Sequence, residues 1–189
     1  MPEVNLLSFF EFYKGEPHQK EAIQLLQQAM PDSLLKNDSS WVVHYRTKPD
    51  QAVPDLNAPF DTQLTEHFTM GELCNQEEAR RFTSSDQLEI AIELCEFLEK
   101  ARAKFGPIRI TSGHRPSAIN AACGGASNSE HLFNTGCGAV DCYPINGNGA
   151  EFEAWVDQNW MFSVGLGMSY RGFCHIGIRA GRPRARWNY

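Results

Sequence analysis

The sequence contains no run of about 18 apolar residues, so it has no segment that could cross a membrane as a helix. Its first residues, MPEVNLLSFFEFYKGEP, lack the basic start and the small-residue cleavage site of a secretory signal. We therefore expect synthesis in the cytoplasm without a signal peptide. The chain also has no C-x-x-C pair, which argues against a zinc ribbon.

An excess of positive charge is lacking as well. The formal net charge is -6, which argues against a nucleic-acid partner bound through its phosphates. The local exception is a group of arginines near the C-terminus, namely Arg171, Arg179, Arg182, Arg184 and Arg186. We interpret this group as a solvated basic tail, and contact with an anionic polymer is the alternative.

What the sequence does contain is enough apolar material for one folded domain. Hydrophobic residues make up 42% and charged residues 21% of the 189 residues. Twelve Phe, five Tyr and four Trp supply bulky core side chains. This composition is typical of a folded protein and argues against disorder. The length fits a single domain with a small appendage.

The spacing of apolar residues divides the chain into three parts. Residues 1–46 are predicted to form a helical N-terminal segment, because a helical stripe runs between Pro17 and Pro31. Residues 47–62 carry three prolines and no clear period, and we interpret them as a linker. Residues 63–189 are predicted to form the main domain.

Helices and short strands follow one another in the main domain. Thr69 with Glu72 fits a capping box at the start of a short helix. A longer helix is predicted, with Ser85 or Asp86 as its cap and Gly106-Pro107 at its end. The other predicted elements are strands at 107–111, 138–143 and 173–179 and helices at 117–123 and 150–160. This pattern favours an α+β fold with a small antiparallel sheet flanked by helices.

Three polar side chains stand out from their surroundings. Asp141 lies inside an apolar strand, where a buried carboxylate needs a partner. His175 is also within a strand, and His131 follows a stretch rich in glycine and serine. Together they can bind zinc and leave a fourth position open to water. Each alone is equally compatible with a salt-bridged aspartate or a core histidine, and Asp157 is expected to be solvated.

The cysteines near these residues allow several interpretations. Cys123, Cys137, Cys142 and Cys174 could be thiols, disulfide partners or metal ligands. Buried thiols are the expectation, because synthesis in the cytoplasm disfavours disulfides. Cys95 lies in a helical apolar stripe and is predicted to be a small core residue.

Residues 110–141, ITSGHRPSAINAACGGASNSEHLFNTGCGAVD, resemble the signature of the zinc D-alanyl-D-alanine carboxypeptidases, which share a fold with the hedgehog signalling domain. HFTMGELC near the start and CHIGIR near the end of the main domain are similar to the same family. The resemblance covers about residues 67 to 187. Residues 1–46 resemble a segment of cyanobacterial and cyanophage relatives.

The resemblance implies the hedgehog/DD-peptidase fold and a role for each matching residue. His131, Asp141 and His175 correspond to the zinc ligands. Arg115 corresponds to the arginine that binds a peptide carboxylate through its planar guanidinium group. Ser129 is expected to hydrogen-bond the substrate or the outer side of a ligand.

Two departures from the family pattern concern catalysis. The aspartate follows the first histidine ligand by ten positions instead of the usual seven, and the longer loop could bring Cys137 to the metal. Relatives carry an acidic residue near the last histidine, whereas Gly177 stands where an aspartate is common. The sequence therefore shows no strong general base, and His114 and Tyr170 are the candidates to replace it.

The implied activity is zinc-dependent hydrolysis of a peptidoglycan stem peptide next to a D-amino acid, by a carboxypeptidase or an endolysin-type endopeptidase. Zinc is the expected cofactor and the stem peptide the expected partner. We expect action on the cell wall after release, as in a phage lysin or a virion enzyme, or retention in the cytoplasm. The alternative, favoured by Gly177, is a catalytically impaired zinc-containing module that binds the cell wall or a protein.

Overall fold

The computed structural model describes residues 34–37, 40–43, 53–134, 136–179 and 184–189. The chain divides into two compact units, Met1–Arg46 and Thr47–Tyr189. In the first unit, strands β1 (Leu34–Asn37) and β2 (Ser40–Val43) pair in antiparallel register. The described part of the predicted helical segment is therefore a strand pair. The helix expected between Pro17 and Pro31 lies outside the described residues.

The described part of the second unit begins at Val53 with irregular chain that packs on the core. Val53, Leu56, Ala58 and Phe60 are partly buried against the hydrophobic core. These residues lie within the linker predicted at 47–62, and their packing attaches this part of the chain to the second unit. Among the described residues, no helix has the length and apolarity that a bilayer crossing requires.

Five strands form the sheet of the second unit, in the order β3-β4-β6-β5-β7. They are β3 (Ile108–Ser112), β4 (Cys137–Pro144), β5 (Ser163–Leu166), β6 (Cys174–Arg179) and β7 (Ala185–Asn188). Neighbours pair antiparallel except β5 and β7, which run parallel. The predicted α+β class with a small sheet flanked by helices is confirmed, and the parallel β7 makes the sheet mixed.

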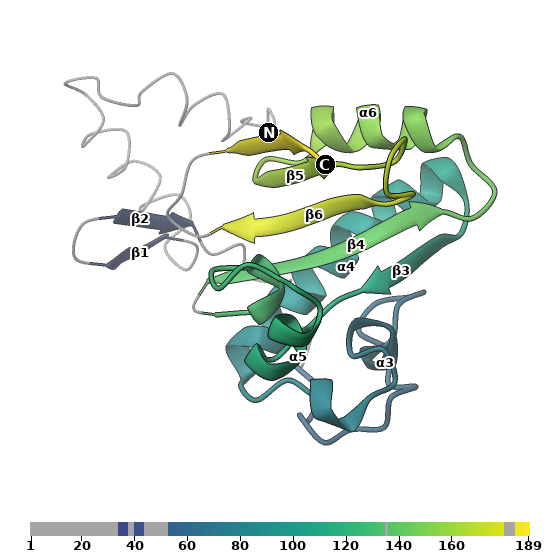
Figure 1. Cartoon of the computed structure of the whole chain (residues 1–189). Helices are drawn as coiled ribbons and strands as arrows, with labels where there is room; N and C mark the ends of the chain where they lie inside the picture. Colours follow the sequence, from purple (N-terminus) through teal and green to yellow (C-terminus); the bar gives the residue numbers. More distant parts are fainter. Residues whose placement is uncertain (1–33, 38–39, 44–52, 135, 180–183) are drawn as a thin grey trace, which may run out of the picture. The chain divides into compact units, whose positions relative to one another are not determined.

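Helix α4 (Ser85–Phe105) lies along one face of this sheet (Figure 1). Its N-cap is Ser84, so the expectation of Ser85 or Asp86 as the cap is wrong; the side chain of Ser84 accepts a hydrogen bond from the backbone N–H of Gln87. It ends at Gly106, whose φ of 77° suits glycine. The other helices are α3 (Met70–Leu73), which starts with the predicted capping box, α5 (Ser117–Ala122), α6 (Gly149–Asn159) and the 3-10 turns η1 (Glu78–Arg80) and η2 (Glu130–Leu132).

The two central strands alternate between the core and the opposite, open face. Val140 and Cys142 of β4, like Cys174, Ile176 and Ile178 of β6, are buried in the core with α4 and α6. Successive side chains of a strand point to opposite faces of the sheet. The residues between these apolar positions therefore point to the open face, where the polar side chains of the sheet gather.

The C-terminal arginines form part of this fold. Arg184 and Arg186 both form ion pairs with Asp157 of α6. Arg186 also donates hydrogen bonds to backbone carbonyls, among them that of Trp160 at 2.7 Å. The expectation of a solvated tail is therefore wrong for Arg186, which is mostly buried. The side chains of Arg184 and Asp157 are 46% and 41% exposed and remain in contact with solvent, as expected. Arg182 lies outside the described residues.

The cysteines are thiols in different surroundings. All six lie within the described residues, and none is in a disulfide there. Cys95, Cys142 and Cys174 are buried as expected, and burial raises the pKa of each thiol well above its ordinary value. Cys123 is exposed, so the expectation of burial is wrong for this residue.

Candidate metal centre

The antiparallel pairing of β4 and β6 brings two of the three predicted ligands together. The register places Asp141 directly opposite His175. Their neighbours Val140 and Ile176 are fully buried in the core. Because side chains alternate along a strand, Asp141 and His175 both point to the open face.

The third predicted ligand arrives on the short turn η2. His131 is its middle residue, and the side chain of Ser129 accepts a hydrogen bond from the backbone N–H of His131 at 3.3 Å. Phe133 follows in the left-handed conformation, with φ 51°, and turns the chain toward β4. Although Asp141 follows His131 by ten positions, the chain still returns Asp141 to His131.

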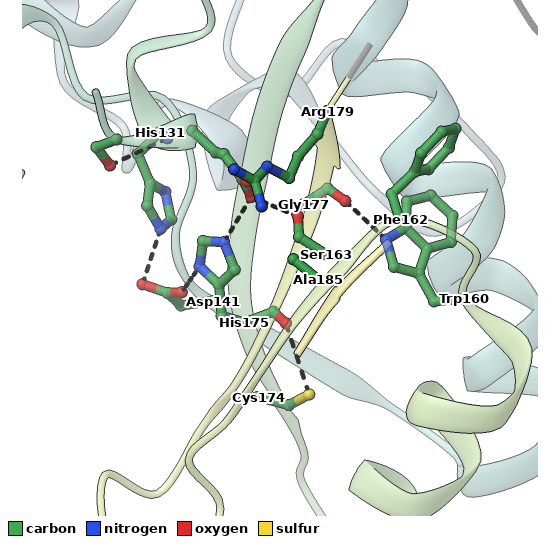
Figure 2. A network of polar contacts seen from close by, with 12 residues as sticks. His131, Asp141, Trp160, Phe162, Ser163, Cys174, His175, Gly177, Arg179 and Ala185 are labelled. Carbon is green, nitrogen blue, oxygen red and sulfur yellow. Dashed lines mark hydrogen bonds and ion pairs between the residues drawn. The ribbon is translucent and has the colours of Figure 1, made fainter. Parts of the chain in front are cut away.

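One ligand atom from each of the three side chains lies within 4.8 Å of the others. Nε2 of His131 is 3.2 Å from Oδ2 of Asp141. Nδ1 of His175 is 2.8 Å from Oδ1 of the same carboxylate. Figure 2 shows Asp141 lying between the two imidazole rings. All three side chains are buried, which gives their charges little screening by water.

Contacts on the far side of each ring determine which nitrogen faces Asp141. Nδ1 of His131 lies 2.8 Å from the carbonyl oxygen of Gly113, which can only accept, so this nitrogen carries a proton. Nε2 of His175 lies 3.1 Å from Oε2 of Glu130, and its Nδ1 is left to face Asp141. The two rings therefore present Nε2 and Nδ1, respectively, to the shared carboxylate.

This arrangement fits a divalent cation. Nε2 of His131 is buried and has no hydrogen-bond partner in the described structure. In the neutral ring it carries a lone pair that faces a carboxylate oxygen, and two acceptors 3.2 Å apart repel each other unless a positive charge lies near them. Two imidazole nitrogens and one carboxylate oxygen are a ligand set of catalytic zinc centres, which keep a further position open.

Burial and mutual contacts shift the pKa values of the three side chains. Burial lowers the pKa of His131, and the attraction of Asp141 opposes this shift. Burial acts in the same direction on His175, but hydrogen bonds to Asp141 and Glu130 outweigh it and raise the pKa. Burial favours the acid form of Asp141, yet contacts with His131 and His175 lower its pKa well below the usual range.

The three residues line a cavity of about 600 Å³. Arg115 lies in its wall, with Nη2 3.9 Å from Oδ2 of Asp141. The backbone N–H of Arg115 donates to the carbonyl of His131 at 2.7 Å, which fixes the arginine beside the first ligand. Other lining residues are Ser129, Glu130, Arg171, Arg179, Trp187 and Tyr189. Cationic and aromatic side chains thus surround the ligands.

Two predicted catalytic residues do not join this group. His114 is buried, its Nδ1 lies 2.7 Å from the carbonyl oxygen of Arg80, and its ring stacks on Phe82. Tyr170 is 75% exposed. Neither residue lines the cavity. Cys137 begins β4 and is not a member of the cluster of possible ligands found among the described residues.

Glu130, the carboxylate that contacts His175, is not among the residues predicted from the sequence. It lies next to His131, whereas the family pattern places the acidic residue near His175. The signal was present as an acidic residue between Ser129 and His131. The aromatic ring of Trp187, 5.1 Å from that of His175, was missed as well, because β7 was not predicted.

Comparison with known proteins agrees with this geometry. A family model described as Peptidase M15 matches residues 66–177, more than half of the chain. This family is metal-dependent and includes the zinc D-Ala-D-Ala carboxypeptidase-like enzymes, so the resemblance stated from the sequence is confirmed. A search among curated proteins finds none that matches the chain.

Proposed function

We propose, from the premise that the chain belongs to the Peptidase M15 family, that it is a zinc-dependent peptidoglycan peptidase. Its substrate would be a stem peptide, cut next to a D-amino acid, as by a carboxypeptidase or an endolysin-type endopeptidase. Its place of action would be the cell wall. The observation that carries this proposal is the convergence of His131, Asp141 and His175 in the wall of one cavity.

The proposed ligands are Nε2 of His131, a carboxylate oxygen of Asp141 and Nδ1 of His175. Zinc bound there would supply a Lewis acid for the scissile carbonyl and a water of lowered pKa. The protein itself contributes rigidity, because two of the ligands lie on paired central strands and the third is hydrogen-bonded to Gly113. A site held in this way needs little rearrangement during the reaction.

Arg115 is the proposed binding group for the substrate. Its side chain lines the cavity, and its planar guanidinium group suits a bidentate pair with a peptide carboxylate. Its distance of 3.9 Å from Asp141 brings such a carboxylate close to the ligands. Arg171 lines the same cavity and adds positive charge for an anionic peptide.

The alternative of an impaired binding module was favoured by Gly177, which leaves β6 without the expected acidic residue. Glu130 now supplies a carboxylate at this place, with Oε2 3.1 Å from Nε2 of His175. The absence of an acid at position 177 therefore no longer argues against an enzyme.

The test is digestion of purified peptidoglycan by the full chain, with zinc and with a chelator, followed by mass spectrometry of the released fragments. We expect cleavage of a stem-peptide bond that stops with the chelator and in His131→Ala. Glu89→Gln, an exposed change on α4, is the control and should cleave like the wild type. Binding to the wall without any cleavage would favour the module, and the absence of bound zinc would overturn both interpretations.

A further inference from the structure

A second row of residues crosses the sheet beside the row that holds Asp141 and His175. The register aligns Ala139 of β4, Gly177 of β6, Ser163 of β5 and Ala185 of β7. All four residues are small, so this row leaves room above the open face of the sheet. Figure 2 shows Ser163, Gly177 and Ala185 next to one another, close to His175.

The carboxylate of Glu130 occupies this room. A Cβ atom added to Gly177 would lie 1.8 Å from Oε2 of Glu130 and 2.6 Å from Oγ of Ser163. The first distance is far below any possible contact, so Glu130 in this position and a side chain at 177 exclude each other. The glycine on β6 and the glutamate on η2 are therefore two parts of one arrangement.

Each oxygen of this carboxylate has a partner. Oε2 accepts a hydrogen bond from Oγ of Ser163 at 2.6 Å and lies 3.1 Å from Nε2 of His175. Oε1 forms an ion pair with Nε of Arg179 at 2.9 Å. The side chain of Glu130 is only 11% exposed. Two hydrogen bonds to Oε2 and an ion pair to Oε1 hold this buried carboxylate in one position.

We infer that Glu130 is a positioning residue of the metal centre and that Gly177 is the residue that admits it. Glu130 accepts the Nε2–H of His175, which leaves Nδ1 of that ring directed at the metal position beside Asp141. One turn, η2, thus carries a ligand, His131, and the residue that orients the ligand on β6. A carboxylate behind a histidine ligand fixes its tautomer and increases its basicity. The inference rests on the proposed function, because it requires these residues to bind zinc.

The first measurement is the zinc dissociation constant, determined by competition with a chromophoric chelator. We expect Glu130→Ala to bind zinc about 10- to 100-fold more weakly, the range for loss of such a partner. Glu130→Gln keeps the side-chain size and an acceptor oxygen, so its loss should be smaller. Glu89→Gln makes the same chemical change at an exposed site of α4 and should bind like the wild type.

Arg179 provides the comparison that separates positioning from a plain ion pair. Arg179→Met removes the partner of Oε1 and leaves the contact of Oε2 with His175 intact. If the only role of Glu130 were to pair with Arg179, this variant would lose as much zinc affinity as Glu130→Ala. We expect a clearly smaller loss in Arg179→Met.

Gly177→Ala tests the other half of the arrangement. The added methyl group must displace the carboxylate of Glu130, so this variant should lose zinc affinity by a factor similar to that of Glu130→Ala. In the Glu130→Ala background, the same change should add little, because the displaced group is already absent. If the double variant weakened zinc binding by the product of the factors measured for the two single variants, the inference would be contradicted.

Nuclear magnetic resonance of the histidine rings gives a readout that does not depend on activity. In the zinc-loaded wild type, Nε2–H of His175 should give a resonance protected from exchange with water. Glu130→Ala should lose this protection. If the alanine variant fails to fold, the same measurement is made on Glu130→Gln.

Three outcomes are decisive. Wild-type zinc affinity in both Glu130 variants would overturn the inference and leave the proposed function intact. A loss of cleavage at unchanged zinc affinity would overturn the positioning role as well. A wild-type protein that binds no zinc would overturn the proposed function and, with it, the inference.

Discussion

Two histidines of this protein are equally buried and share one type of hydrogen bond, and they have different surroundings. His114 belongs to an aromatic cluster with Phe82 and Phe133, and His131 belongs to the candidate metal centre. Both side chains are 2% exposed. Nδ1 of each ring lies close to a backbone carbonyl oxygen. For His114 this is the oxygen of Arg80, at 2.7 Å. For His131 it is the oxygen of Gly113, at 2.8 Å.

The difference lies in what surrounds the rest of the ring. His114 stacks on Phe82 with ring centroids 5.2 Å apart and meets Phe133 at 5.4 Å. Nε2 of His131 faces the carboxylate of Asp141 at 3.2 Å. Burial lowers the pKa of both histidines. A buried neutral histidine becomes a candidate ligand only where its second nitrogen points at other ligands, and this depends on residues that are distant in the sequence.

The largest effect is expected when the two histidines are changed in parallel. His131→Ala should lose zinc binding and reduce peptidoglycan cleavage to background, because one of three ligands is removed. His114→Phe should keep both properties, since the aromatic cluster accepts another ring. Elemental analysis and the cleavage assay check the pair, and equal losses in the two variants would contradict the comparison.

The next effect concerns Arg115. This residue follows His114 in the chain, and its backbone N–H donates a hydrogen bond to the carbonyl oxygen of His131. Arg115→Lys keeps the charge but removes the planar pair of donors. A hydrogen bond to a charged group contributes about 1.5 to 3 kcal/mol, so KM for the stem peptide should rise roughly 10- to 100-fold. Zinc content should stay that of the wild type. Steady-state kinetics on a synthetic stem peptide provide the measurement, and an unchanged KM would exclude Arg115 as the carboxylate-binding group.

A smaller effect concerns stability in the aromatic cluster. His114→Phe leaves the carbonyl oxygen of Arg80 without this partner, at a cost of about 1 to 3 kcal/mol in the free energy of unfolding. Because burial lowers the pKa of His114 below 6.5, the unfolded chain binds a proton there that the folded chain does not. The stability from His114 is thus lost as the pH falls from 7 to 5. In urea unfolding, the difference in the free energy of unfolding between the wild type and His114→Phe should therefore decrease as the pH falls over this range.

The smallest effect is expected at the cysteines around the metal centre. Cys123 is exposed and lines the cavity, whereas Cys142 and Cys174 are buried on the core side of β4 and β6. A maleimide reagent should therefore modify Cys123 first and reach the two buried thiols only after unfolding. The modification should slow cleavage of the stem peptide, and Cys123→Ser should abolish this slowing. Rapid modification of Cys142 in the folded protein would contradict the burial of this strand.

Much of the fold is predictable because its elements carry local signals. The capping box of Thr69 and Glu72 marks α3, and the apolar spacing after Ser84 marks α4. The alternation around Asp141 and His175 marks the two central strands. Strand β7 escaped prediction because its sequence, ARWN, has charged and aromatic residues without alternation. Its place is determined by pairing with β5 and by the ion pairs of its arginines with Asp157.

The candidate site was predictable in its ligands and unpredictable in the groups behind them. His131, Asp141 and His175 fall within motifs that the sequence displays. The place of Glu130 beside His131 is visible in the sequence, but its contact with His175, 45 positions away, is not. The room for its carboxylate arises from Gly177 and Ser163 on different strands, and only the register of the sheet reveals that these residues are neighbours.

The most direct test is the anomalous scattering of a crystal of the full chain grown with zinc, recorded on both sides of the zinc absorption edge. The account predicts one strong peak bound by Nε2 of His131, a carboxylate oxygen of Asp141 and Nδ1 of His175, with Glu130 at Nε2 of the last ring. A peak elsewhere, or none at the three side chains, would contradict it.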